Sequence, residues 1–273
     1  MKTTNTLASI LICIVIAFSI SSRLGEVQSA RKQSPPRKLL AIFAHPDDET
    51  MVGPLLARYA REAGVVVYLA IVTDGDKGVM PHAGIPAGEQ LAAARVKEAE
   101  CACQKLGAQP PILLGFPDGA IIPSRMLADL ATKLEKLILD LRPEVIVTWG
   151  PDGGYGHADH RLVSAVITQV AQADERSPLL YYAGLPRSQM PGAMAELRFP
   201  APFAFTADKY LNVRIPYSKQ DEARAREALA CHKSQFTPQA MEQISAFAEK
   251  INRGVSYLRL WSGGKPRTDL FDR

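Results

Sequence analysis

Ala44–Glu49, AHPDDE, directly follows the apolar run Leu39–Phe43, LLAIF, and is the stretch from which the fold and the site can be predicted. A short apolar run that stops at charged residues predicts a buried strand whose carboxyl end carries an imidazole and three carboxylates to the edge of a sheet. His45 and Asp48 lie three residues apart, so a helical turn between them lets both side chains converge on one cation such as zinc. Asp47 would then lie beside the metal as a candidate base.

The same residues have a second interpretation that involves no metal. Acidic residues directly after a proline are favoured in the first turn of a helix, where free amides and the positive end of the helix dipole stabilise them. Taken alone, AHPDDE is compatible with either interpretation.

A second polar cluster favours the metal site. His157–His160, HADH, follows the glycine-rich segment 150–156 and leads into an apolar stretch that predicts a helix. Two histidines three residues apart at a helix start share one face, so one or both can reach toward AHPDDE. An isolated histidine is usually structural, but two complementary clusters at two strand ends indicate one shared site.

Composition predicts a large globular domain with a sizeable core, since the 273 residues are 47% hydrophobic and 22% charged. The formal net charge is +4, and the basic residues are spread along the chain. This distribution argues against a nucleic-acid partner.

The first thirty residues predict a secretory signal peptide. Lys2 precedes the apolar stretch Leu7–Ile20, and small residues up to Ala30 suit a signal peptidase. The apolar stretch is shorter than the about 20 residues that span a bilayer, which favours cleavage and export to the periplasm or the extracellular space. The alternative is an uncleaved membrane anchor with the domain in the cytoplasm, because more basic residues follow the apolar stretch than precede it. The expected organisation is a signal peptide at 1–30, a linker at 31–38 and one domain at 39–273.

Strand and helix patterns alternate along the domain, which predicts an α/β fold with a parallel sheet and helices on both faces. Ligands then bind at the carboxyl ends of the strands. Strands are expected at 39–43, 65–72, 111–114, 144–149, 179–183 and 211–215. Helices are expected at 51–62, 89–106, 124–141, after His160, and at 221–231 and 238–251, with a pocket-lining loop at 189–206.

Polar residues follow the first four predicted strands and would form one rim. Glycine and aspartate are also common turn residues, which is the favoured explanation for Gly75, Asp152 and Gly153. For Asp118, a role in the turn and a role in the site both stay open. Dinucleotide binding is not favoured, because the first strand–helix turn carries carboxylates where that fingerprint needs glycines.

The cysteines predict no disulfide framework. Cys101 and Cys103 are two residues apart in a predicted helix and so poorly placed to bond each other, and Cys231 has no obvious partner. A Cys-x-Cys metal pair is an alternative, but buried small hydrophobic side chains are favoured.

With these motifs, the chain resembles the PIG-L/LmbE-type zinc-dependent N-acetylglucosaminyl deacetylases. The resemblance rests on AHPDDE, the helix from Arg95 to Gly107, GFPDG, GGYGHADH and Ala230–Gln235, and it covers roughly 39–236. It implies a Rossmann-like, mostly parallel sheet and an enzyme that removes acetyl groups from amino sugars or cleaves a related amide. The implied substrate is a small molecule or oligosaccharide that carries an N-acetyl amino sugar.

Carried over residue by residue, the resemblance implies that His45, Asp48 and His160 bind one Zn²⁺ per chain. Asp47 matches the general base of the family. The site would also accept iron or another divalent ion.

The resemblance implies three further roles in catalysis. His157 stabilises the oxyanion or protonates the leaving amine, Asp159 orients His157, and Tyr155 helps to bind the tetrahedral intermediate. The residues expected to bind the sugar or border the pocket are Arg95, Asp118 and His232.

The residue types suit amide hydrolysis. An amide is a poor electrophile, so a metal must polarise its carbonyl and acidify a water molecule, while a carboxylate such as Asp47 takes the proton. His157 and Tyr155 can stabilise charge that develops only near the transition state. Two other functional classes stay open: a different metal hydrolase, such as a phosphoesterase, and a non-catalytic sugar-binding domain. An intact Asp47 and His157 argue against the latter.

Overall fold

The computed structural model describes residues 35–121, 124–176, 178–189 and 205–273, and Pro36–Arg273 form one compact unit. The predicted signal peptide and most of the predicted linker lie outside the described residues. Among the described residues, no helix is long and apolar enough to cross a bilayer.

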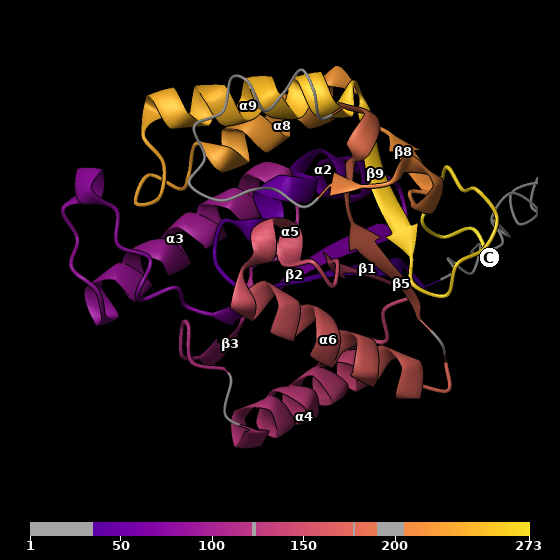
Figure 1. Cartoon of the computed structure of the whole chain (residues 1–273), viewed down its shortest axis with the longest axis horizontal. Coiled ribbons are helices and arrows are strands. Elements are labelled where there is room, and N and C mark those ends of the chain that lie inside the picture. The colour runs from indigo at the N-terminus through magenta and orange to yellow at the C-terminus, as the bar shows by residue number, and fades with distance from the viewer. Residues whose placement is uncertain (1–34, 122–123, 177, 190–204) are drawn as a thin grey trace, which may run out of the picture. The chain divides into compact units, whose positions relative to one another are not determined.

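The described elements alternate between strands and helices (Figure 1). The main strands are β1 (Arg37–Phe43), β2 (Val65–Thr73), β3 (Ile112–Phe116), β4 (Val145–Trp149), β5 (Leu179–Ala183), β8 (Val213–Pro216) and β9 (Val255–Leu260). The α-helices are α2 (Gly53–Arg61), α3 (Glu89–Leu106), α4 (Ser124–Leu141), α5 (Gly153–Gly156), α6 (Ala158–Ala173), α8 (Lys219–Leu229) and α9 (Pro238–Asn252). Short elements are β6 (Leu185–Pro186), β7 (Phe205–Thr206), η1 (Asp48–Val52), η2 (Pro81–Ala83), η3 (Arg187–Gln189) and η4 (Asp208–Tyr210).

The main sheet has seven strands in the order β3-β2-β1-β4-β5-β9-β8. Strand β1 pairs in parallel with β2 on one side and β4 on the other, and β3 and β5 extend the parallel region. The antiparallel strands β9 and β8 complete it. The predicted α/β fold with a mostly parallel sheet is therefore confirmed. Strand order reverses between β1 and β4, and at such a switch point the adjoining loops diverge and leave a crevice for ligands.

Helices cover both faces of the sheet because β1 is apolar on both of its faces. Leu39, Ala41 and Phe43 pack with residues of α2, α3 and α8 in one buried cluster. Leu40 and Ile42 pack with residues of α4 and α6 in a second cluster on the opposite face. All five side chains are fully buried, so the centre of the sheet is rigid beneath the loop that follows β1.

Several element bounds differ from the prediction. Strand β1 begins at Arg37, whose side chain bonds to Glu62 at 2.6 Å, so the end of the predicted linker is strand. Strand β9 was missed, although its residues alternate between partly buried and buried positions, the period of a half-exposed strand. The predicted pocket loop, 189–206, lies mostly outside the described residues.

The prediction of no disulfide was wrong. Cys101 of α3 and Cys231, just after α8, form a disulfide with their Cα atoms 5.9 Å apart and a sequence separation of 130. Sequence spacing gave no indication of it, because the pairing depends on α3 and α8 packing side by side. Cys103 is free and buried, and burial raises the pKa of its thiol to about 12, which fits the predicted small hydrophobic role.

We expect the Cys101→Ser/Cys231→Ser variant to have an unfolding free energy about 2–5 kcal/mol below that of the oxidised protein, because the disulfide closes a long loop. Urea unfolding with and without a thiol reductant measures the difference. Both cysteines line a surface cavity of about 450 Å³, so a small reductant can reach them. Cys103→Ala is the matched control and should keep the reductant sensitivity. An equal response of the wild type and the double variant to reductant would show that the bond does not form.

Candidate metal centre

The two polar motifs meet at the switch point between β1 and β4. AHPDDE follows β1 and enters η1, whereas HADH lies at the start of α6, after the tight turns of α5 that follow β4. His45 and Asp48 are each 7% exposed, and His160 is fully buried. The pairing of two neighbouring strands thus brings together residues more than a hundred positions apart.

Three side chains, those of His45, Asp48 and His160, form a triangle in the manner of metal ligands. His45 Nδ1 lies 3.2 Å from His160 Nε2, and His160 Nε2 lies 3.1 Å from Asp48 Oδ1. The nearer Asp48 oxygen to His45 Nδ1 is Oδ2, at 3.7 Å. Tetrahedral ligands with bonds of about 2.0–2.1 Å stand about 3.3–3.4 Å apart, so the two shorter separations are close to those of a zinc or similar site.

Neighbouring groups fix the orientation of both imidazoles. His160 Nδ1 lies 3.0 Å from the carbonyl of Gly153, which can only accept, so this nitrogen carries the proton and Nε2 presents its lone pair. His45 Nε2 lies 3.2 Å from carboxylate oxygens of both Asp118 and Asp159, so the lone pair of His45 is on Nδ1. Two lone pairs that face each other at 3.2 Å repel unless a cation or a proton lies between them.

The third ligand, Asp48, is held equally firmly. Its Oδ2 accepts hydrogen bonds from the backbone N–H groups of Ala44 and His45 at 3.0 and 2.9 Å and from Trp149 Nε1 at 3.2 Å. Oδ1 is left to face the histidines. The Trp149 ring also stacks on His160, with ring centroids 4.5 Å apart.

The electrostatics of the site favour a bound cation. Burial lowers the pKa of His45, but the hydrogen bonds to Asp118 and Asp159 and the charge of Asp48 outweigh it and raise the value to about 10. Burial raises the pKa of Asp48, but the charges of His160 and His45 hold it well below its usual range. The carboxylates around His45 therefore create a strongly negative environment, which a proton or a metal ion can neutralise.

The groups of possible ligands whose atoms lie closest together among the described residues both contain His45, and neither contains Asp48. In one, His45 lies with His157 and His160, and in the other with Asp118 and Asp159, and in each the ligand atoms are all within 4.8 Å of one another. The second group uses the protonated Nε2 side of His45. These groups therefore compete with the triangle of His45, Asp48 and His160 as metal sites.

Asp47 lies next to the predicted ligands in an unusual backbone conformation. Its φ of 110° is in the left-handed region that non-glycine residues rarely adopt. Its carboxylate lies 3.2 Å from Arg95 Nη2, and its side chain is 17% exposed. Burial raises the pKa of Asp47 to about 6, although the charge of Arg95 acts in the opposite direction. A carboxyl group with this pKa can exchange a proton near neutral pH.

His157 and Tyr155 lie beside the metal ligands at a more open position. The His157 ring centroid is 4.8 Å from that of His45 and 4.7 Å from that of His160, and the Tyr155 ring is 5.1 Å from His160. Burial and the charges of His45 and His160 lower the pKa of His157, so this imidazole is neutral at pH 7. Burial raises the pKa of Tyr155, which therefore keeps its hydroxyl proton.

Asp159 was expected to orient His157 through its carboxylate, but its carboxylate has other partners. The Asp159 carboxylate bonds to His45 Nε2 and to the backbone N–H of Gly119, at 3.2 and 2.8 Å. It is the backbone N–H of Asp159 that donates to His157 Nδ1, at 3.3 Å. Asp159 thus orients His157 through the main chain and serves the first ligand, His45, through its side chain.

The chain is similar to known proteins over most of its length. The family model described as PIG-L, GlcNAc-PI de-N-acetylase, matches residues 40–171. A Mycobacterium sp. (strain KMS) protein named 1D-myo-inositol 2-acetamido-2-deoxy-alpha-D-glucopyranoside deacetylase is 31% identical, over 83% of this chain and 84% of that protein. The chain belongs to the PIG-L family.

Solved structures confirm the PIG-L fold. N,N'-diacetylchitobiose deacetylase from Pyrococcus horikoshii aligns with a TM-score of 0.59 and 20% identity, covering 95% of this chain and 93% of that one. The 4-carboxy-2-hydroxymuconate hydratase GalB from Pseudomonas putida aligns with a TM-score of 0.58 and 17% identity, covering 82% and 95%. The fold thus also occurs in a hydratase, and a function for this PIG-L chain must be argued from its site.

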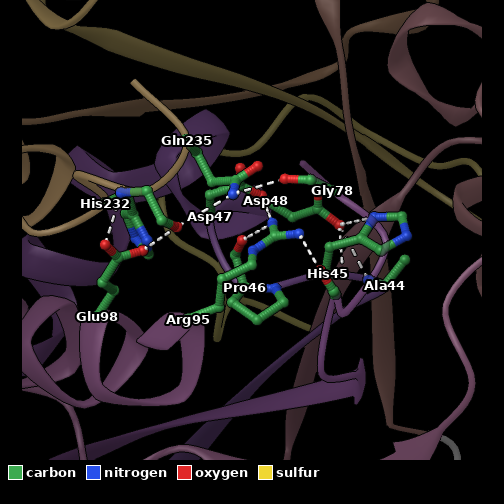
Figure 2. A network of polar contacts seen from close by, with 12 residues as sticks. Ala44, His45, Pro46, Asp47, Asp48, Gly78, Arg95, Glu98, His232 and Gln235 are labelled. Atoms are coloured by element: carbon green, nitrogen blue, oxygen red, sulfur yellow. Dashed lines mark hydrogen bonds and ion pairs between the residues drawn. The ribbon is translucent and has the colours of Figure 1, made fainter. Parts of the chain in front are cut away.

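Three residues predicted to bind the sugar are enclosed. Arg95 is 3% exposed, Asp118 is 7% exposed and His232 is fully buried. Arg95 donates to the backbone carbonyl of Gly75 at 3.0 Å. It also donates to the Pro46 carbonyl at 2.5 Å and faces Asp47 (Figure 2). These contacts place the Arg95 side chain beside the candidate base, and its role in binding the sugar stays a prediction.

The other two enclosed residues have equally specific partners. Asp118 contacts His45 and accepts the backbone N–H of Lys77 at 3.1 Å, so it supports a metal ligand. His232 bonds to Glu49 at 2.6 Å. Sequence analysis assigned no role to Glu49 or Trp149, although Glu49 closes the AHPDDE motif and Trp149 is the last residue of a predicted strand.

We expect Zn²⁺ to change the fluorescence of Trp149, because its indole touches both Asp48 and His160. The Trp261→Phe variant leaves Trp149 as the one tryptophan in the sequence and permits titration of metal-free protein. In this background, Asp48→Asn should weaken zinc binding at least about 100-fold, because it removes a charged ligand. Substituting a residue that only supports a ligand typically weakens metal binding by about 10- to 100-fold.

His157→Gln is the matched control and should bind zinc within about threefold of the parent. It separates the competing ligand groups. If His157→Gln loses zinc and Asp48→Asn keeps it, the metal is held by His45, His157 and His160, and the assigned triangle is wrong.

Proposed function

We propose that this protein is a zinc-dependent hydrolase that removes the N-acetyl group from an N-acetylglucosamine-type sugar or glycoconjugate. The observation that carries the proposal is a partly exposed carboxylate, Asp47, with a pKa raised to about 6, beside three convergent ligand atoms. The 31% identical relative named as a deacetylase of an acetamido-deoxyglucopyranoside supports the same reaction.

The residues fit a divalent cation, and we propose His45, Asp48 and His160 as its ligands. Two imidazole nitrogens and one carboxylate oxygen suit Zn²⁺ and leave coordination positions for exchangeable groups. When bound, such a cation supplies Lewis acidity, which polarises an amide carbonyl and lowers the pKa of water.

Asp47 acts as the general base. It accepts a proton from the attacking water as the oxygen–carbon bond forms, and its pKa near 6 lets it give that proton up again. Arg95 holds the carboxylate in place from the buried side. The carbon–nitrogen bond then breaks, the sugar nitrogen takes a proton, and acetate and the free amine leave.

His157 supplies a hydrogen-bond donor at the reacting centre. Its Nδ1 accepts the backbone N–H of Asp159, so the neutral ring carries its proton on Nε2. Nε2–H can stabilise the developing oxyanion or pass a proton to the leaving amine, and the protonated Tyr155 hydroxyl is a second donor near it. Both donors gain strength from the partly dehydrated setting.

For the substrate, we propose a glucosaminide whose acetamido group enters the site and whose second group stays outside. The named relatives act on an inositol glycoside and on diacetylchitobiose, which share an N-acetylglucosamine unit and differ in the attached group. N-acetylglucosamine, diacetylchitobiose and the inositol glycoside therefore form the first test panel.

We expect zinc-dependent release of acetate from at least one member of that panel. Asp47→Asn should lower kcat at least about 100-fold with one zinc still bound, because the amide cannot take the proton. Acetate release and zinc content are measured on the same preparations.

Asp174→Asn is a matched control, since Asp174 also pairs with an arginine, Arg176 at 2.6 Å, but does so at the end of α6. Its activity should stay within about twofold of the wild type. A wild-type protein that binds zinc and releases acetate from no acetylated sugar would contradict the proposed reaction.

We propose that the protein is exported. The Cys101–Cys231 disulfide supports this location, because disulfides persist mainly in oxidising compartments. Residues 1–30 would then be removed as a signal peptide. Expression of the full chain in a bacterial host followed by cell fractionation should give a shortened, disulfide-bonded product in the periplasm. A full-length, reduced protein in the cytoplasm or the inner membrane would contradict export.

A further inference from the structure

The backbone of Asp47 is held in its rare conformation by a buried side chain two residues further along. Asp47 N–H donates to Glu49 Oε2 at 3.1 Å. Glu49 is 1% exposed and lies in η1, directly after the proposed ligand Asp48. The Asp47 carbonyl accepts the N–H of Thr50 at 3.1 Å, so Glu49 provides the hold on the N–H side of a residue whose φ of 110° is strained.

Glu49 is in turn held by a residue from the far end of the chain. Its Oε1 lies 2.6 Å from His232 Nε2, and His232 is fully buried. Burial lowers the pKa of His232, but the charge and hydrogen bond of Glu49 raise it above the usual range, so the two form an ion pair. A buried carboxylate needs such a partner, because a charge without one is costly in the interior.

Glu49 is the hydrogen-bond partner of the His232 ring among the described residues. The bond runs from Nε2, and Nδ1 makes no hydrogen bond to a described residue. The link between His232 and the candidate base therefore runs through Glu49.

The segment that carries His232 is anchored on both sides of it. Cys231 is tied to α3 by the disulfide. The backbone N–H of Ser234 donates to Glu98 at 2.6 Å, and Gln235 donates to the carbonyl of Gly78 at 3.0 Å. Figure 2 shows His232 and Gln235 reaching the same polar network as Asp47 and Arg95.

We infer that Glu49 and His232 are positioning residues for the general base: the pair fixes the backbone of Asp47, while Arg95 fixes its carboxylate. This inference rests on the proposed function for its catalytic consequence. Its structural part, the hold of Glu49 on the Asp47 N–H, is independent of the reaction.

The test compares Glu49→Ala, Glu49→Gln and His232→Ala. Glu49→Ala removes the acceptor of the Asp47 N–H, and kcat should fall about 10- to 100-fold with KM within about twofold and one zinc retained. Glu49→Gln keeps an amide oxygen for that N–H and should restore kcat to within about fivefold of the wild type. The kcat of the Glu49→Ala/His232→Ala double variant should lie within about threefold of that of Glu49→Ala, because the effects of substituting two residues that act as a unit are not additive.

Ser234→Ala is the matched control. Ser234 is 3% exposed and lies two residues from His232, but its hydroxyl bonds to Glu98 and not to the Asp47–Glu49 pair. Its kcat should stay within about twofold of the wild type, even if its melting temperature falls as far as that of Glu49→Ala. A loss of kcat that simply follows the melting temperature in all variants would overturn the positioning role.

Hydrogen exchange of the Asp47 amide, followed by NMR, is the second measurement and needs no substrate. Exchange should be slow in the wild type and in Ser234→Ala and at least about tenfold faster in Glu49→Ala and His232→Ala. Unchanged exchange in Glu49→Ala would overturn the inference whatever the activity. If the wild type releases no acetate but these exchange rates differ as expected, the proposed reaction is wrong and the hold on Asp47 stands.

Discussion

The site depends on the convergence of two imidazole lone pairs and one carboxylate between β1 and β4. Neither histidine can rotate to relieve this convergence. His160 is tied to the Gly153 carbonyl and stacked on Trp149, and His45 is tied to two carboxylates. Such an arrangement is unfavourable as a set of neutral groups and favourable around a cation, so the surrounding fold is built to keep the ligands in place.

The buried carboxylates form two groups with different tasks. Asp118 and Asp159 lie on the far side of His45, where they increase the negative charge that the metal ion meets. Glu49 lies on the far side of Asp47 and is paired with His232. The carboxylate between these groups, Asp47, is the one with a raised pKa and some exposure, which are the properties that a proton acceptor needs.

Sequence patterns predicted the parts of this structure that depend on local signals. Helix α3 has the predicted bounds, because Gly88 and Gly107 interrupt it at both ends with positive φ angles. The ligand motifs were found because histidine and aspartate at two strand ends are unusual. The Cys101–Cys231 pairing and the Glu49–His232 contact were not found, since they join segments 130 and 183 residues apart, and no local pattern encodes such a distance. The motif that contains Arg95 indicates only that this residue is near the site, so its burial and its contact with Asp47 could not be predicted from the sequence.

The glycines after β2 show how the loops of separate strands form one unit. A Cβ atom at Gly75 or Gly78 would lie 2.2 or 2.4 Å from Arg95 Nη1, so both positions need glycine for the guanidinium to fit. The guanidinium in turn bonds to the Pro46 carbonyl and faces the Asp47 carboxylate. Gly75, which sequence analysis explained as a turn residue, therefore also makes room, with Gly78, for the cation that orients the base. Because the loop after β2, helix α3 and the loop after β1 meet at one guanidinium, none of the three can shift without moving Asp47.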